Sequence, residues 1–193
     1  MTKEAEREKE SSYLQVARSL HNDRLVDVYV GDIDDETEPY RVQQVVLEKV
    51  AEYFAAALRP DTFSEGQNGR LHFPDDDTDV WQILLQWAIQ RVVPCWQSID
   101  QDVRHSLLVR CWVTADKYGI QDFQNEIMLE ALMSFRISIG IEALYVGVKL
   151  TAPGSALRRL VSEELVYKVY TEESVKFAEL NELDGTKIHR RLS

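Results

Sequence analysis

The sequence predicts an α/β protein of the α+β class, in which a small sheet is flanked by helices and followed by extra C-terminal helices. Two segments, LVDVYVG at 25–31 and RLHF at 70–73, indicate short strands. Elsewhere, apolar residues recur with the spacing of amphipathic helices, most clearly over residues 108–132. Two such helices joined at a glycine need a third element to cover them, and the rest of the chain supplies it.

The helix pair within residues 108–132 is the best-defined part of the sequence. One face of its first helix carries, at i, i+3, i+4 and i+7, Leu108, Cys111, Trp112 and Ala115. Gly119 accepts the left-handed conformation that closes a last helical turn, and Asp122 suits the positive end of the next helix. The residues that this second helix is expected to bury are Phe123, Ile127, Ala131 and Phe135.

Length and composition bound the class of protein. A chain of 193 residues, 45% of them hydrophobic, is expected to form one domain or one domain with a small appendage. No apolar run reaches about 18 residues, so no membrane span is expected, and residues 1–10 lack the apolar region of a signal peptide. Cys95 and Cys111 lie in apolar sequence and are too few for a disulfide framework. We expect an intracellular protein, cytoplasmic or nuclear.

The net charge of −11 is concentrated in the first half of the expected fold. Residues 25–100 contain fifteen acids and five bases, whereas residues 101–193 contain thirteen acids and twelve bases. An acidic surface repels phosphate backbones, which disfavours direct binding of DNA or RNA. A basic protein partner would suit this acidity, although solubility alone is a sufficient reason for it.

Residues 1–11 alternate Lys or Arg with Glu and are expected to form a flexible tail. The pattern then becomes that of a short amphipathic helix, with an apolar face made of Tyr13, Val16, Ala17 and Leu20. So short a helix needs a surface on which to dock. That surface belongs either to its own domain or to a second copy, and periodicity does not distinguish the two.

The next segment is expected to form a β-hairpin and one helix. Asp27 interrupts the first strand as a polar group on the less buried face, and the second strand is expected at 39–42. The acidic turn between them lacks the glycine and the spacing of an EF-hand loop, so a solvated turn is the better interpretation. Residues 44–58 have the apolar spacing of one helix, which Pro60 ends.

A loop at 61–69 carries the aromatic residue Phe63 and leads into the strand that contains His72, which is expected to be an ordinary strand residue. The acids of residues 74–79 look like a metal site. The apolar spacing of a helix begins directly after them, so capping of that helix by an Asp side chain explains them better. This helix is expected to run to about Gln90.

Residues 136–170 are expected to form a helical extension, and residues 171–193 a tail with a basic end. The first extension helix has helical spacing of Ile141, Leu144, Tyr145 and Val148. Gly140 and Gly147 lie inside that segment and weaken the prediction. Ser155 is expected to cap a second helix that follows it.

No catalytic motif is present. The phosphate-binding, nucleophile-elbow and zinc-protease patterns are all missing from the sequence. The four histidines are His21, His72, His105 and His189. None forms a nucleophile–base or zinc-ligand motif with the two cysteines. We therefore expect no enzyme, no metal and no cofactor. An unrecognised catalytic site would need His72 or His105 beside a carboxylate and a nucleophile.

The order helix, hairpin, helix pair, strand and paired helices resembles the BTB/POZ family, in particular its single-domain fungal members. The resemblance covers about residues 25–132, with further similarity in the helices up to Tyr170. The stretches that carry it are LVDVYVG at 25–31, YFAAAL at 53–58, FSEG at 63–66, PDDD at 74–77 and ADKYGI at 115–120, with LRRL at 157–160. It implies a BTB/POZ domain over residues 12–135, followed by the extension at 136–170.

The sequence departs from the family pattern in three places. The segment at 42–44 is V-Q-Q, without the histidine of the family's V-H-K-like segment, and Ala51 stands in place of a family serine. The family's Y-T-G is replaced by I-Q-R at 89–91, so the tight glycine turn is expected to be lost. These departures indicate a diverged member.

The resemblance implies protein–protein interaction rather than catalysis. BTB domains commonly form homodimers through the N-terminal helix, which makes the candidate dimer contact Tyr13, Val16, Ala17 and Leu20. Many also bring substrates to a cullin-type ubiquitin ligase through a hydrophobic-x-Glu motif, which Phe63, Ser64 and Glu65 match in type and position. A Phe63 side chain folded back on its own core fits the sequence equally well. The alternative function is a structural or transcription-associated dimerisation module with no ligase role.

Overall fold

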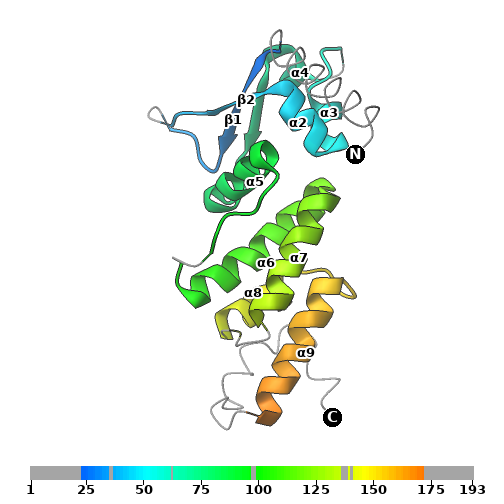
Figure 1. The fold of residues 1–193 in the computed structure, drawn as a ribbon. Helices are drawn as coiled ribbons and strands as arrows, with labels where there is room; N and C mark the ends of the chain where they lie inside the picture. Colours follow the sequence, from blue (N-terminus) through cyan, green and yellow to red (C-terminus); the bar gives the residue numbers. More distant parts are fainter. Residues whose placement is uncertain are drawn as a thin grey trace, which may run out of the picture. The chain divides into compact units, whose positions relative to one another are not determined.

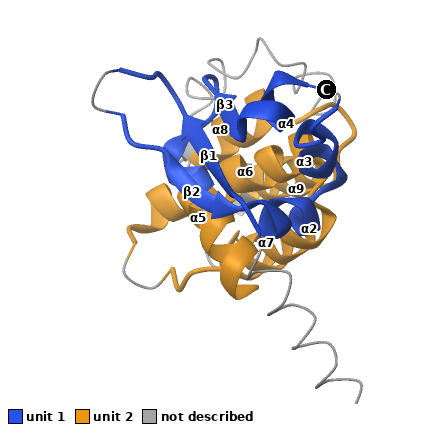
Figure 2. Ribbon diagram, turned by 90° about the horizontal axis from the view of Figure 1, so that it is seen from above, with its two compact units in different colours: residues 1–81 blue, residues 82–193 orange. Residues whose placement is uncertain are grey.

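The computed structural model describes residues 23–34, 37–61, 63–96, 99–135, 139 and 141–171. In this part of the chain a three-stranded mixed sheet is combined with eight helices, which confirms the predicted α+β class (Figure 1). Packing divides the chain inside helix α5 into two compact units, Met1–Trp81 and Gln82–Ser193 (Figure 2). Each unit is described by itself below.

In the first unit, strand β1 (Leu25–Val30) lies between β2 (Tyr40–Gln43) and β3 (Arg70–Phe73). β2 runs antiparallel to β1 with Val42 opposite Val26, and β3 runs parallel with Leu71 opposite Val28. Side chains alternate between the two faces of a strand. The buried face consists of Val26, Val28, Val30, Val42, Leu71 and Phe73. The hairpin and the third strand are therefore confirmed.

The opposite face of the sheet is polar. Asp27 lies there with its Oδ1 atom 3.7 Å from Nε of Arg41, and both side chains are largely exposed, so this ion pair adds little stability. The Arg70 guanidinium lies 4.2 Å from the centroid of the Tyr29 ring. His72 donates a hydrogen bond from Nε2 to the Gly31 carbonyl, at 3.0 Å. Asp27 and His72 are thus strand residues on the less buried face, as predicted.

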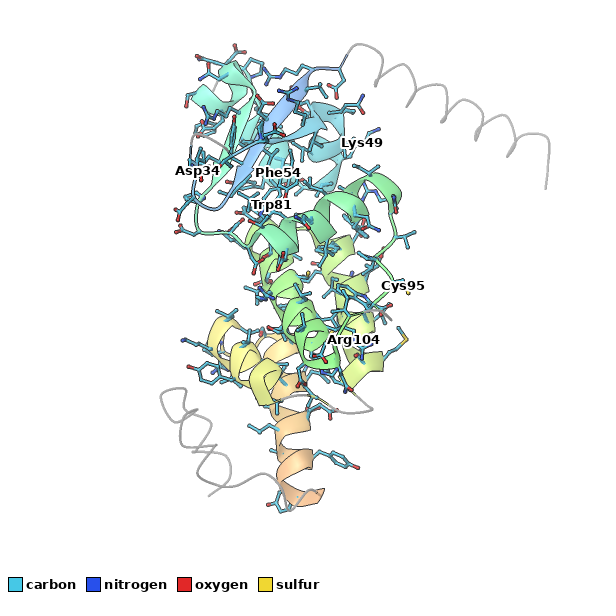
Figure 3. All side chains as sticks on the ribbon, turned by 90° about the vertical axis from the view of Figure 1, so that its left-hand side faces the viewer. Asp34, Lys49, Phe54, Trp81, Cys95 and Arg104 are labelled. Atoms are coloured by element: carbon cyan, nitrogen blue, oxygen red, sulfur yellow. The ribbon has the colours of Figure 1, made fainter. Side chains whose placement is uncertain are left out.

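Three aromatic rings fill the core of the first unit. The ring of Phe54 lies 6.2 Å from that of Phe73 and 5.9 Å from that of Trp81 (Figure 3). Phe73 and Trp81 stack at 4.5 Å. The Trp81 indole donates to Oδ2 of Asp76 at 2.8 Å, so its one polar atom is satisfied inside the packed cluster.

The prediction of a single helix over 44–58 is wrong in one respect, because this segment forms two helices. They are α2 (Gln44–Val50) and α3 (Glu52–Ala57), separated by Ala51 in an extended conformation, φ −155° and ψ 149°. The apolar spacing is nevertheless correct, since the expected inward residues are buried on both sides of the break, as at Leu47 and Phe54. Alanine is the best helix former, so the break reflects tertiary packing rather than local propensity.

Helix α5 (Thr78–Gln90) begins as predicted, with an aspartate cap. Oδ1 of Asp77 accepts from the amides of Asp79 and Val80, at 2.9 and 3.3 Å. At its other end, Arg91 stands where the BTB/POZ pattern has a glycine, and it adopts a left-handed φ of 55°.

Two contacts hold Arg91 in that conformation. Its amide donates to the Trp87 carbonyl at 2.7 Å, and its guanidinium lies 4.7 Å from the Trp87 ring centroid. A side chain in the left-handed region costs roughly 1–2 kcal/mol. A cation–π contact returns about 0.5–1 kcal/mol of that at an exposed site. A left-handed conformation that usually requires glycine is therefore adopted here by an arginine.

In the second unit, α6 (Gln101–Tyr118) packs against α7 (Gln121–Phe135). The Asp100 side chain caps α6 by accepting from the amides of Asp102 and Val103. Gly119 closes α6 at φ 68°, and the Ile120 amide donates to the Ala115 carbonyl at 2.9 Å. All four residues predicted to face inward from α7 are buried, namely Phe123, Ile127, Ala131 and Phe135. The prediction for the helix pair is confirmed.

The two helices of the extension are α8 (Ile141–Leu150) and α9 (Ala156–Thr171). Ser155 caps α9 as predicted, because its Oγ accepts from the Arg158 amide at 3.2 Å. Gly147, which weakened the prediction of α8, has a packing role. A Cβ atom at this position would lie 2.9 Å from Val161 of α9. Glycine therefore permits the close approach of the two helices.

Candidate protein-interaction site

Phe63, Ser64 and Glu65 lie at the start of α4 (Ser64–Asn68), a short helix inside the segment that was predicted as a loop. Phe63 is its extended N-cap residue, and the Phe63 carbonyl accepts from the Gln67 amide at 3.2 Å. The Phe63 side chain is 52% exposed, so the alternative in which it folds back on the core is wrong. Ser64 and Glu65 are exposed as well, and their side chains share a 3.0 Å hydrogen bond.

Gly66 fixes the position of α4 against the preceding chain. It is buried, and a Cβ atom there would lie 2.0 Å from the carbonyl oxygen of Arg59 and 2.5 Å from the carbonyl carbon. Both are backbone atoms, which do not move aside as a flexible side chain does. Only glycine allows the backbone of α4 to approach the end of the preceding segment this closely.

Arg24, just before β1, ties three parts of the first unit together. Its Nη2 atom donates to the Gly66 carbonyl at 2.6 Å and lies 3.5 Å from the Leu58 carbonyl. Its Nε atom donates to Oε1 of Gln44 at 2.5 Å. Hydrogen bonds from a charged donor are about twice as strong as neutral ones. Arg24 therefore anchors α4 to the ends of α2 and α3.

Gly69 completes the attachment of α4 to the sheet. It ends the helix at φ 65°, and its amide donates to the Glu65 carbonyl at 2.8 Å. Its own carbonyl accepts from the Asp27 amide of β1, also at 2.8 Å. Phe63 and Glu65 are thus displayed from a short turn that backbone contacts hold on both sides.

The candidate dimer residues are not part of the structure that is described. Tyr13, Val16, Ala17 and Leu20 all lie outside the described residues.

His105 lies beside a hydroxyl group, which bears on the possibility of an unrecognised catalytic site. Its Nε2 atom is 2.9 Å from Oγ of Ser134, and its ring meets Phe135 edge-on at 5.2 Å. His105 is fully buried and Ser134 is partly exposed, so the pair forms a polar contact between α6 and α7. His72, the other candidate, bonds to a backbone carbonyl.

Other chemistry has little support in the described residues. No three His, Cys, Asp or Glu side chains gather there in a way that would hold a metal ion. Cys95 and Cys111 form no disulfide; Cys111 is buried, whereas Cys95 is exposed despite its apolar neighbours in sequence (Figure 3). Of the helices described, none combines the length and the apolar composition that a membrane crossing requires.

Two residues that support the site were not singled out from the sequence. Gly66 is part of the FSEG stretch at 63–66, and Arg24 belongs to no sequence motif. A glycine inside a helical turn is a usable signal, because its presence where alanine is favoured indicates a close contact. Nothing local marks Arg24, since its partners lie 20 to 42 residues away.

Comparison with known proteins does not add a family. No protein-family model matches this chain, and no curated protein matches it. The resemblance to BTB/POZ proteins therefore rests on the sequence stretches alone.

Proposed function

We propose that this chain is a protein-interaction module of the BTB/POZ type that presents Phe63 to Glu65 to a cullin-type ubiquitin ligase scaffold. In this proposal it acts by binding and has no catalytic activity, and it self-associates through the segment that contains Tyr13, Val16, Ala17 and Leu20. One observation carries the proposal. A half-exposed Phe63 stands beside an exposed Glu65 on a turn fixed by Gly66 and Arg24.

An aromatic side chain in this setting suits an anchor for a partner pocket. Burying a phenylalanine removes roughly 150–250 Å² from water, and such anchors dominate the binding energy of many interfaces. A side chain on a turn that is already ordered loses less conformational entropy on binding than one on a mobile loop. Glu65 adds a charge that a basic group of the partner can pair with at the rim.

The deciding experiment is a calorimetric titration of the full chain with the N-terminal domain of the BTB-binding cullin. Glu65→Lys reverses the charge at the site, and Glu38→Lys makes the same change at an exposed position in the β1–β2 connection. We expect micromolar or tighter binding for the wild type and for Glu38→Lys. Loss of the anchor in Phe63→Ala should weaken binding by about 30-fold, equivalent to roughly 2 kcal/mol.

Each other outcome changes the proposal in a defined way. No heat with the wild-type chain would remove the ligase role, and a dimeric mass by light scattering would then favour the dimerisation module. Binding that Glu65→Lys leaves unchanged would retain the scaffold but move the contact away from α4. Equal losses in Glu65→Lys and Glu38→Lys would indicate a general effect of charge.

A further inference from the structure

Helix α7 carries three large apolar side chains on its exposed face. Leu129 is 60% exposed, Leu132 41% and Met133 59%. Their spacing of i, i+3 and i+4 places them together on one side of the last two turns. We refer to Leu129, Leu132 and Met133 as the α7 strip. Single exposed apolar residues are ordinary, but a contiguous group of them indicates a binding surface.

The α7 strip is separate from the face that builds the core. The opposite side of α7 packs into the core through four buried residues, Phe123, Ile127, Ala131 and Phe135. The second half of α7 is therefore apolar on two sides, which folding of the second unit does not require. The strip needs another occupant.

The charges beside the strip indicate the chemistry of that occupant. Asp122, Glu126 and Glu130 fall at i, i+4 and i+8, and so form an acidic row along one edge of the strip. Helix α7, with the sequence QDFQNEIMLEALMSF, contains no basic residue, and the one base next to it in sequence is Arg136, which directly follows its last residue. Pairing of two α7 strips would bring like charges together, which is unfavourable. A basic segment with its own apolar residues fits the strip better.

The chain contains such a segment. Residues 186–193, TKIHRRLS, include three bases, Lys187, Arg190 and Arg191, and no acid. Ile188 and Leu192 stand four residues apart, the spacing of neighbours on one face of a helix. No other stretch of eight residues after α9 combines this positive charge with two large apolar side chains. Its composition is complementary to the strip in charge and in apolar content.

The length of the chain allows the two to meet. Helix α9 contacts α7 and ends at Thr171, and fifteen residues then separate it from Lys187. Fifteen residues span up to about 50 Å when extended. Helix α7 itself is only about 22 Å long. Helix α9, with 16 residues, is about 24 Å long, so the two helix lengths together are still shorter than the reach of the fifteen residues.

We propose that residues 186–193 bind the α7 strip of the same chain, with Ile188 and Leu192 on the strip and the bases beside Asp122, Glu126 and Glu130. A tether of this length gives an effective concentration in the millimolar range, so a weak contact is well populated. This inference is independent of any contact at Phe63.

Methionine methyl resonances test the contact in the full chain. The chain has three methionines, and Met133 is in the strip, so ¹³C-methyl labelling gives one direct reporter, with Met128, four residues before Leu132, at the edge of the strip. The Met133 signal is assigned by its loss in Met133→Leu. Arg190→Glu reverses a charge in the basic segment, and Lys176→Glu makes the same reversal outside it.

We expect Arg190→Glu to move the Met133 signal by more than its linewidth and Lys176→Glu to leave it in place. Raising the salt from about 0.1 to 1 M should move it in the same direction, because the screening length falls from about 10 to 3 Å. An unmoved signal in Arg190→Glu would overturn the proposal, as would equal shifts in both variants. If dilution moves the Met133 signal of the wild type to its position in Arg190→Glu, the contact is made by a second copy. That result would overturn the same-chain arrangement.

Discussion

The turn that displays Phe63 and the α7 strip both expose apolar side chains, but they are built in opposite ways. The α4 turn depends on backbone geometry, since Gly66 admits a close backbone contact and Arg24 bonds to carbonyl groups. The α7 strip depends on side chains alone, because α7 is a regular helix whose other face forms the core. The α4 turn is therefore expected to be sensitive to substitutions at distant residues, whereas the α7 strip is expected to be almost independent of them.

The contrast separates stability from recognition. Substitutions at the residues that support the α4 turn should change folding and binding together, because the displayed side chains move with the backbone. Substitutions in the α7 strip should change binding and leave folding nearly unchanged. Three variants test this difference, from the largest expected effect on unfolding free energy to the smallest.

Gly66→Ala should have the largest effect. The added Cβ would meet the Arg59 carbonyl oxygen at 2.0 Å, so α4 must shift away from the rest of the unit. We expect a loss of about 3 kcal/mol or more in urea unfolding, at the upper end of overpacking effects. Gln67→Ala, at an exposed position of the same helix, is the control and should change little. An unchanged unfolding midpoint in Gly66→Ala would contradict the close backbone contact.

Arg24→Ala should have an intermediate effect. It removes the donors to the Gly66 and Leu58 carbonyls and to Gln44, a loss of about 1.5–3 kcal/mol for charged hydrogen bonds. Hydrogen exchange of the Gly69 amide, which bonds within α4, should become faster. Arg41→Ala, which breaks only the exposed pair with Asp27, should cost less than about 1 kcal/mol. Equal costs for the two arginines would mean that Arg24 does not anchor α4.

Leu129→Ala should have the smallest effect. Leu129 is exposed, so the same truncation that costs about 2–5 kcal/mol in a core should change its unfolding free energy by less than about 0.5 kcal/mol. Ile127→Ala, two residues earlier and fully buried, provides the comparison on the same helix. A large destabilisation by Leu129→Ala would show that the strip already contributes to the folded chain, and the two surfaces would then be alike.

Local patterns predicted much of the architecture. The strands, the helix pair, Gly119 and the Asp77 and Ser155 caps all follow from residues within one or two turns of each other. Signals of this kind are carried by neighbouring residues, because propensity, capping and apolar spacing are local.

Contacts between distant residues were not predictable in the same way. Three features depend on packing between distant residues, which the spacing of apolar residues does not predict. They are the break at Ala51, the helix at Ser64–Asn68 and the left-handed Arg91. At Arg91, Trp87 one turn earlier supplies the contacts that accompany a left-handed conformation, which the sequence did not predict. For the candidate site, sequence identified the displayed residues Phe63 to Glu65 but not the Arg24 anchor behind them.

Gly147 has a consequence for how the C-terminal part of the chain unfolds. Val161 of α9 lies close to α8 at this glycine, so the two helices pack together, and α8 packs against α6 as well. A ten-residue helix such as α8 is marginal by itself in water. Helices α8 and α9 should therefore open in one cooperative step, with matched hydrogen-exchange protection of their central amides. A protease that cuts in the 152–155 turn would leave this packing intact and the two helices still paired.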